Sequence, residues 1–365
     1  MKRTEYHCQS CGRAIYFDGL CYNCRQRQSR ERAQAWSDVE VARKMRAIIA
    51  ALDDKFYKKE ENREFFELLA YKDISTEKIA EAATRVGVYY PSELYRDAPP
   101  KAREKLLALL ETPECKEASH ILLCLALAGG EDVLATFARL ERNPLPWVKK
   151  LHVPLSVYAQ AGGWTFDKAG NHIQLNFDKC YPVFSASPDN SDAAVSVAVP
   201  REETCPHCGT RLVDILMLDG KDRRLAFLNL PGTVRVPCCP QCSCEGFIVR
   251  YQLDGDSAME LVNPFGDGEK MRDNVYAEMV TKKFALSTRP ESLFFARGND
   301  EDVITVGGFA NWIQDFQYEP CPDCGKTMRY FASVPWAALM DSAEGALYLE
   351  ICPDCQIIGA FHQQT

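Results

Sequence analysis

The sequence predicts an α+β protein with a cysteine-rich N-terminus, a helical middle and a mainly antiparallel β C-terminal part. Three observations lead to this fold class. Twelve cysteines fall into six C-x-x-C pairs, and apolar residues between 36 and 142 recur at three- and four-residue steps. Beyond residue 150, short apolar runs alternate with Gly, Asn and Asp turns. We expect the three parts to span 1–34, 35–150 and 151–365.

The bulk composition is that of a globular protein. Hydrophobic residues make up 46% of the 365 residues and charged residues 26%. A net charge of −8 argues against a protein that binds nucleic acid over its whole surface. Residues 1–34 nevertheless carry seven Lys/Arg against three Asp/Glu. This basic segment suits an RNA, ribosome or acidic-protein partner, and equally a solvated helix that has no partner.

No segment of the sequence looks like an export signal or a membrane span. The residues after Met1 lead directly into a cysteine pair, and no apolar stretch follows them. The longest apolar run, 121–128, has eight residues and is far too short to cross a bilayer. We therefore expect a cytoplasmic protein with no membrane partner.

Metal binding best explains the cysteine content. Seventeen cysteines in a chain expected to be cytoplasmic are not disulfide partners, because that compartment is reducing. Zinc prefers four thiolates in a tetrahedron, and two residues between ligands let one tight turn present two sulfurs to one ion. Six such turns predict about three structural zinc ions.

The first site is a compact zinc ribbon with spacing C-x2-C-x9-C-x2-C. The second and third sites each join two C-P-x-C turns about thirty residues apart. The predicted metal ligands are twelve cysteines: Cys8, Cys11, Cys21, Cys24, Cys205, Cys208, Cys239, Cys242, Cys321, Cys324, Cys352 and Cys355.

The second and third sites share flanking sequence. Each first turn precedes an apolar stretch, and each second turn lies between two strand-like runs. We interpret 201–251 and 317–363 as two copies of one zinc-clipped β unit, which could also exchange their cysteine pairs. Cys238 and Cys244 leave the ligands of the second site uncertain. Cys115, Cys124 and Cys180 lie in apolar context and are expected to be small core residues.

The middle of the chain predicts a stack of short antiparallel helices. The expected helices span 25–53, 61–71, 75–87, 100–111, 114–128 and 131–142. Helices of this size are typical of a HEAT-like α-solenoid, although a plain helical bundle fits as well. Within the β-rich part we expect helices near 269–284 and 335–341.

No catalytic motif is visible, so we predict that the protein is not an enzyme. The sequence lacks G-x-S-x-G, a P-loop and G-x-G-x-x-G. Each predicted site is complete in cysteine, whereas a catalytic zinc keeps one position for water. His207, inside the second site's first turn, is expected to be an exposed turn residue.

The stretch 306–314 carries a recognisable pattern. It reads Gly-Gly-aromatic-x-x-Trp-x-Gln and is followed by a C-x-x-C, a Met-containing strand and a Tyr-rich strand into a second C-x-x-C. This pattern resembles the YwqG-like domain of unknown function over roughly 155–365. More distantly, it is similar to the C-terminal domain of the programmed-cell-death zinc proteins. Ala310 departs from the family, which often has Pro at that position.

The resemblance implies a fold without established catalytic residues. It also implies a role as an immunity protein, since such domains often occur beside bacterial polymorphic toxins. We therefore expect a non-catalytic protein-binding protein, an antitoxin that binds and neutralises a cognate toxin.

The alternative is a nucleic-acid- or ribosome-associated zinc-ribbon factor. It would contact phosphates and stack bases through residues 1–34. The side chains concerned are Lys2, Arg3, Arg13, Arg25, Arg27, Arg30, Arg32, Tyr6, Tyr16 and Tyr22.

Overall fold

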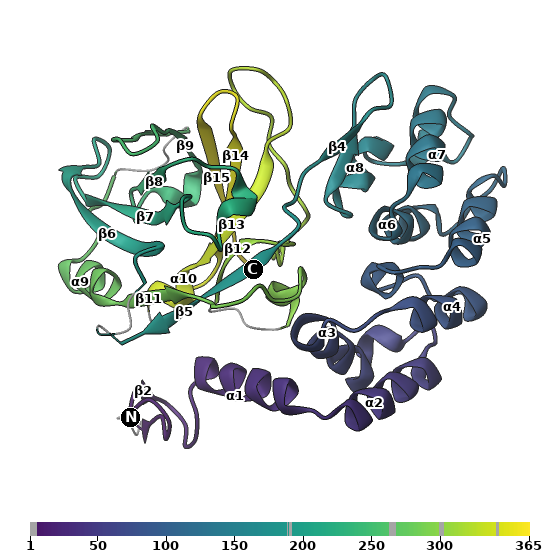
Figure 1. Ribbon diagram of the computed structural model, residues 1–365, viewed down its shortest axis with the longest axis horizontal. Helices are drawn as coiled ribbons and strands as arrows, with labels where there is room; N and C mark the ends of the chain where they lie inside the picture. The colour runs from purple at the N-terminus through teal and green to yellow at the C-terminus, as the bar shows by residue number, and fades with distance from the viewer. Residues whose placement is uncertain (1–5, 188, 190–191, 263–267, 299–302, 341–342) are drawn as a thin grey trace.

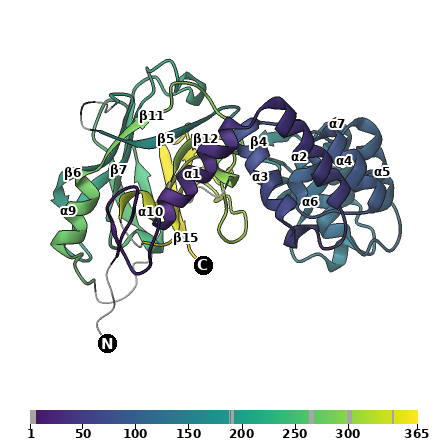
Figure 2. The ribbon, with the colours of Figure 1, turned by 90° about the horizontal axis from the view of Figure 1, so that it is seen from below.

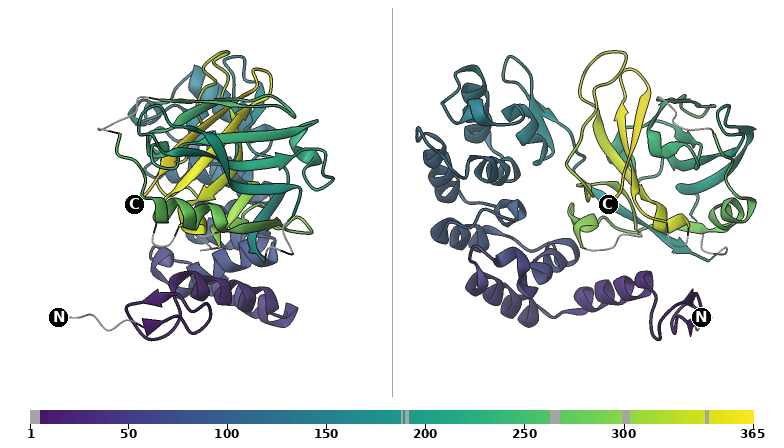
Figure 3. Two further views of the ribbon diagram at one scale, coloured as in Figure 1. Left: turned by 90° about the vertical axis from the view of Figure 1, so that its left-hand side faces the viewer. Right: turned by 180° about the vertical axis from the view of Figure 1, so that it is seen from behind.

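The α+β fold class is confirmed by a computed structural model, which describes residues 6–187, 189, 192–262, 268–298, 303–340 and 343–365. The helices of the middle part form a curved stack beside the β-rich part (Figure 1). The first helix runs back from this stack beneath the β-rich part and carries the N-terminal ribbon with it (Figure 3). Lys2 and Arg3 lie outside the described residues.

The N-terminal ribbon is a hairpin of two short strands, β1 (Tyr6–His7) and β2 (Ala14–Ile15), followed by α1 (Tyr22–Ala35). The helix expected over 25–53 is in fact two helices, because α2 (Asp38–Ala51) starts anew after a break at Trp36. Ser37 caps α2 by accepting a hydrogen bond from the Glu40 backbone, and the Glu40 carboxylate accepts one from the Ser37 N–H. This capping box stabilises a helix start at that point.

The stack continues through α3 (Glu60–Lys72), α4 (Glu77–Val86), α5 (Pro100–Leu110), α6 (Ala118–Ala128), α7 (Glu131–Arg142) and α8 (Leu155–Gln160). Short 3-10 turns lie at Phe56–Lys58, Ser92–Tyr95 and Val148–Lys150. The α6 helix begins at Ala118 and not at the expected 114. The Thr112 hydroxyl donates to the Leu109 and Glu114 carbonyls, so this segment closes α5 instead.

The helical core extends beyond residue 150. Besides the helices it includes Trp164 and Phe166 from the small hairpin β3 (Trp164–Phe166) and β4 (His172–Gln174). Trp164 donates its indole N–H to the Ala126 carbonyl of α6 at 2.9 Å. The expected boundary at 150 therefore falls inside a core that reaches Phe166.

An antiparallel sheet of eight strands forms the centre of the β-rich part, in the order β10-β9-β15-β14-β13-β12-β5-β11. Their bounds are β5 (Cys180–Ala186), β9 (Phe247–Arg250), β10 (Ala258–Leu261), β11 (Lys283–Leu286), β12 (Ile304–Gly307), β13 (Arg329–Pro335), β14 (Ala346–Cys352) and β15 (Ile357–Gln363).

A second sheet of three antiparallel strands packs on the first. It consists of β6 (Val195–Thr204), β7 (Arg211–Asp219) and β8 (Thr233–Cys238). One apolar core joins the two sheets and contains, among others, Val213 and Val236 of the small sheet and Phe331 and Leu347 of the large one. Burying this shared surface drives their association. The remaining elements are α9 (Asp273–Thr281), α10 (Trp336–Leu339) and 3-10 turns at Ala226–Leu228, Ser243–Glu245 and Phe295–Arg297.

The two proposed copies, 201–251 and 317–363, contain the expected strands but use them differently. In the second copy β13, β14 and β15 are neighbours in one sheet, whereas the first copy places β7 and β8 in the small sheet and β9 in the large one. The corresponding strands β9 and β15 pair antiparallel, with Phe247 opposite Ala360. Phe247 comes five positions after Cys242 and Ala360 five positions after Cys355, the last quartet cysteine of each copy, as a local two-fold axis would require.

Several contacts among the described residues join the helical stack and α1 to the β-rich part. The Ser292 hydroxyl donates to the Leu69 carbonyl of α3, and Arg297 pairs with Glu93. Figure 2 shows α1 passing across the β-rich part, and there Arg30 lies 4.8 Å over the Phe184 ring of β5. No helix among the described residues is long and apolar enough to cross a membrane.

Candidate metal centres

All twelve predicted ligands come together in three groups of four. The groups are Cys8, Cys11, Cys21 and Cys24; Cys205, Cys208, Cys239 and Cys242; and Cys321, Cys324, Cys352 and Cys355. Within each group the sulfurs all lie within 4.8 Å of one another. Each pair therefore joins its nearest partner in sequence, which rules out exchange between the two copies.

The sulfur spacing fits a tetrahedral metal ion. A tetrahedron with metal–sulfur bonds of ~2.3 Å has edges of about 3.8 Å. The sulfurs of Cys11 and Cys21 are 3.7 Å apart, those of Cys205 and Cys242 are 3.9 Å apart, and those of Cys324 and Cys352 are 3.8 Å apart. None of the seventeen cysteines forms a disulfide. The arrangement suits a bound ion rather than disulfides, whose sulfurs bond at ~2.05 Å.

The first turn of each centre has one shared backbone geometry. In all three, the N–H of the glycine after the second cysteine donates to the carbonyl of the first: Gly12 to Cys8 at 2.9 Å, Gly209 to Cys205 at 2.9 Å and Gly325 to Cys321 at 2.8 Å. These glycines have φ values of +74°, +71° and +70°. Glycine adopts this left-handed conformation without strain, so the C-x-x-C-G pattern specifies the turn.

The first centre joins the β1–β2 turn to the start of α1. Cys21 is the N-cap of α1, and Cys24 lies in its first turn, where the helix dipole favours thiolates. The Cys21 N–H donates to the Cys8 sulfur at 3.2 Å, and Arg27 donates to the Cys24 sulfur at 3.6 Å. Among the described residues, the other side chains in this small core are Ile15 and Leu20.

The second centre is buried on all sides. Cys205 and Cys208 follow β6, Cys239 and Cys242 follow β8, and none of the four is more than 7% exposed. Leu212, Met259 and Leu261 pack around them.

Neither Cys238 nor Cys244 joins the second centre. Adjacent residues of a strand point to opposite faces. Cys238 accordingly lies in the core between the two sheets, while Cys239 turns toward the metal site. Cys244 is exposed. His207 also lies outside the quartet, and it is half-buried rather than exposed as expected.

The third centre is more exposed to solvent than the second. Cys324 is exposed and Cys355 half-buried, while Cys321 and Cys352 are buried. Arg250 of β9 holds Asp323 in this first turn through two hydrogen bonds of 2.8 and 2.9 Å. Lys326 bonds to Asp354 across the two turns at 2.8 Å. In the second turn, Gln356 rather than a glycine takes the left-handed conformation, at φ 54°.

Thiol ionisation also fits a divalent cation. Burial raises the pKa of Cys8, but hydrogen bonds from the backbone of Cys21, Cys11 and Ser10 outweigh it and bring the pKa to about 5. Burial raises the pKa of Cys24 and of Cys242 to about 12. Without a metal, four thiols this close do not all ionise, because neighbouring thiolates repel one another. A bound cation neutralises this repulsion and displaces the remaining protons.

The remaining cysteines outside the quartets match the expectation of core residues only in part. Cys124 and Cys180 are fully buried, and Cys115 is half-buried. Burial raises the pKa of each of these thiols, so none is activated as a nucleophile.

The Gly-Gly-aromatic-x-x-Trp pattern has a packing role in this structure. A Cβ on Gly307 would lie 2.1 Å from the Lys179 carbonyl oxygen, and Gly308 has φ +72°. Trp312 stacks on Tyr348 at 4.6 Å and lies 5.9 Å from Phe361. These residues form an aromatic cluster that packs on β14 and β15.

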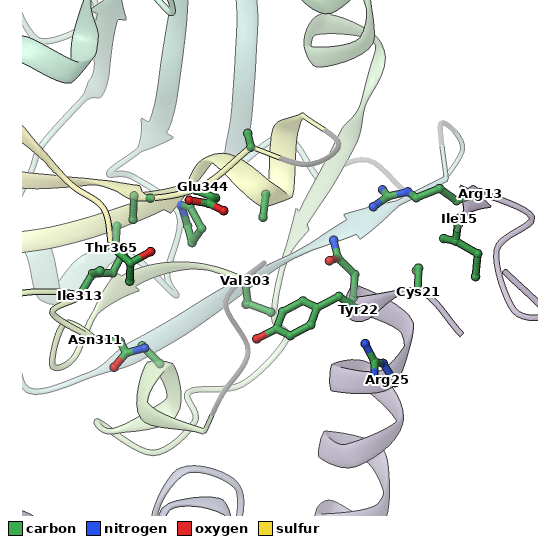
Figure 4. Close-up of a pocket in the computed structure, with 18 of the residues that line it drawn as sticks. Arg13, Ile15, Cys21, Tyr22, Arg25, Val303, Asn311, Ile313, Glu344 and Thr365 are labelled. Atoms are coloured by element: carbon green, nitrogen blue, oxygen red, sulfur yellow. The ribbon is translucent and has the colours of Figure 1, made fainter. Parts of the chain in front are cut away.

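A cavity of about 770 Å³ separates the ribbon from the β-rich part. Figure 4 shows Arg13, Tyr22 and Arg25 on its ribbon side and Asn311, Glu344 and Thr365 on the other. The wall that faces the arginines contributes one carboxylate, that of Glu344, and no Lys or Arg among the described lining residues. No local sequence pattern indicates this cavity, because it depends on how α1 packs against the β-rich part.

Comparison with known proteins gives one informative match. The chain is 28% identical over 285 residues to the Salmonella typhimurium protein called Uncharacterized protein YpfL. The match covers 74% of this chain and 64% of that relative, so the chain spans less than two thirds of the relative's length. No protein-family model and no solved structure matches the chain.

Proposed function

We propose that this protein is a non-catalytic cytoplasmic binding protein in which three zinc ions are structural, and that it acts as an immunity protein against a bacterial toxin. The observation that carries the proposal is that each metal centre already has four sulfur ligands. A tetrahedral zinc with four thiolates has no position for water or substrate, so it holds the fold and performs no chemistry.

Zinc is the metal that four cysteines at this spacing favour. The first centre supports this assignment further, since the ribbon has almost no apolar core of its own. Elemental analysis of the purified chain should give three zinc ions per molecule. A zinc content near zero, or iron in its place, would contradict the assignment.

The charge distribution supports a basic toxin as the partner. Residues 151–365 carry 28 Asp/Glu against 17 Lys/Arg, so most of the negative charge of the chain lies in the β-rich part. Charge complementarity speeds encounter with a basic partner and favours correct orientation. Toxins that attack nucleic acid are commonly basic, and the resemblance to the YwqG-like domain points to the same role.

The test is made with the products of the genes adjacent to the one that encodes this chain. An adjacent product should stop growth when expressed alone, and co-expression of this protein should restore growth. The two proteins should also elute together in size-exclusion chromatography. A non-adjacent protein of similar charge is the control. The proposal fails if no adjacent product is toxic or if none binds.

A second candidate is a nucleic-acid- or ribosome-associated factor acting through the ribbon. Exposed aromatic rings favour it, since Tyr16 is 74% exposed, Phe17 46% and Tyr22 42%. Several arginines are already engaged within the protein, which weakens it: Arg25 lies over Phe17, Arg27 bonds to Ser10, and Arg30 lies over Phe184.

This candidate predicts RNA binding that weakens steeply as salt increases. Deletion of residues 1–34 should abolish the binding, and the remaining chain should keep its other two zinc ions. Binding that survives the deletion, or no binding at low salt, would eliminate it.

A further inference from the structure

A second cavity lies where the end of the helical stack meets the third metal centre. Its volume is about 1040 Å³. One wall comes from α7, α8 and the β3–β4 hairpin, and the other from the turns of the third centre and the start of β13. The volume is sufficient for a small organic ligand.

The carboxylates that line this cavity already have partners. Glu141 accepts hydrogen bonds from the backbone N–H and the hydroxyl of Ser156, at 2.9 and 3.1 Å. Asp167 accepts from the backbone of Ala169 and Asn171, each at 2.9 Å. Asp354 pairs with Lys326.

Three cations that line the cavity have no carboxylate partner among the described residues: Arg142, Lys168 and Arg329. Arg142 uses its Nε for the Ala138 carbonyl of its own helix at 3.1 Å. The cavity therefore has more positive charge than its own acidic residues neutralise.

Arg329 is the best placed of the three to bind a ligand. Its guanidinium lies 3.8 Å over the Phe177 ring and donates through Nη2 to the Asn176 carbonyl at 2.9 Å. These two contacts fix the orientation of the planar guanidinium group. Its Nε is buried and has no hydrogen-bond partner in the described part of the chain.

The environment of Arg329 is costly for an isolated charge. Burial lowers the pKa of its guanidinium; the charge of Asp178 opposes this effect, but the described residues show no ion pair between the two. A half-buried cation is stabilised when an anion completes its hydrogen bonds. An arginine fork matches the two oxygens of a carboxylate or phosphate group.

We propose that this cavity binds a small organic ligand through a carboxylate or phosphate group, with Arg329 as the counter-charge and Arg142 and Lys168 at the rim. The apolar side chains of Phe166 and Ile173 would contact the rest of the ligand. This site is separate from the proposed toxin-binding role and does not depend on it. Bound ligand would join the helical stack to the β-rich part.

The test uses isothermal titration of the full-length, zinc-loaded protein with two probes, inorganic phosphate and succinate. Binding of phosphate alone indicates a phosphorylated ligand, and tighter binding of succinate indicates a carboxylic acid. Arg329→Gln should weaken the binding of the preferred probe at least tenfold, and Arg329→Lys should weaken it less. Arg85→Gln, which changes an exposed arginine of α4 far from this cavity, is the matched control and should have no effect.

A second variant is needed because Arg329→Gln could lose binding simply by misfolding. The double change Arg142→Gln and Lys168→Gln alters two exposed side chains and should weaken binding severalfold without changing the melting temperature. The proposal is overturned if neither probe binds at 10-millimolar concentrations. It is also overturned if binding is the same in the native protein, Arg329→Gln and the double variant.

Discussion

The two C-P-x-C units share a sequence pattern but not an environment. In the unit of 201–251 all four sulfurs are buried, and its strands divide between two sheets. In the unit of 317–363 one sulfur is exposed, and the three strands are neighbours in a single sheet. The first turn of each unit has the same hydrogen bond and the same glycine conformation. The pattern thus specifies the metal-binding turn, while the surrounding strands decide how deeply the metal is buried.

The largest expected difference between the units concerns the loss of one ligand. Cys239→Ser removes a fully buried sulfur and leaves three buried thiols without a metal, so the apolar core beside them loses its support. We expect the melting temperature to fall by roughly 10 °C or more, because structural zinc contributes strongly to folding.

Cys324→Ser is the matched change in the open centre, where water can solvate the remaining thiols. We expect it to release one zinc ion with a smaller fall in melting temperature. Calorimetry together with zinc analysis measures both effects. Equal losses of stability in the two variants would show that burial does not matter.

The second and third centres are also expected to differ in how soon a chelator removes their zinc. The exposed Cys324 and half-buried Cys355 give a chelator access to the third centre, while the second centre has no exposed sulfur. We expect a thiol-competing chelator to remove zinc from the third centre before the second. Native mass spectrometry of samples taken during chelation, combined with the Cys324→Ser variant to identify the centre, measures this order. Release from the second centre first would contradict it.

A smaller effect is expected from the turn glycines. Gly209→Ala and Gly325→Ala each place a Cβ in open space, so the cost is only that of the left-handed conformation. We expect each change to destabilise the protein by about 1 kcal/mol. Gln356→Gly, at a left-handed position in the second turn, should not destabilise it. Denaturant unfolding compares the three variants, and a clearly larger cost in one unit would show that the turns differ.

The smallest effect concerns the Arg250–Asp323 pair, which only the third centre has. The hydrogen bond from Arg250 lowers the pKa of Asp323 below its ordinary value of 3.8. A carboxyl group whose pKa is lower in the folded than in the unfolded protein stabilises the fold at pH values above its unfolded pKa. This contribution is lost as the pH falls through the folded pKa. Asp323→Asn should therefore lower the melting temperature slightly at pH 7, and the difference from the native protein should vanish at acid pH. A difference that grows on acidification would contradict the assignment.

Local chemistry made much of this fold predictable. Helices α3, α5 and α7 lie within one residue of their expected limits, since apolar spacing and end residues specify them. The twelve ligands followed from their spacing, but spacing left open an exchange of cysteine pairs between the two units and a role for Cys238 or Cys244, which only the folded structure decides. The break at Ser37 was missed because the apolar spacing continues across it, although Ser37 and Glu40 form a recognisable capping pair.

Long-range pairing was not predictable. Nothing local to 247–250 indicates that β9 leaves the strands of its own unit and pairs with β15. The cavity around Arg329 escaped prediction for the same reason, because its walls come from segments more than 150 residues apart. The identity of the metal, the partner and the location in the cell stay predictions.

The place of β15 in the large sheet has a consequence for synthesis. It is the last described strand along the chain, yet it lies between β9 and β14. The ribosome makes the helical stack first, and that part can fold while translation continues. Strands β9 and β10 must wait until β15 has emerged, with their apolar faces uncovered in the meantime. A pause late in translation would therefore expose the nascent chain to aggregation at this sheet, and chaperone binding would be strongest there.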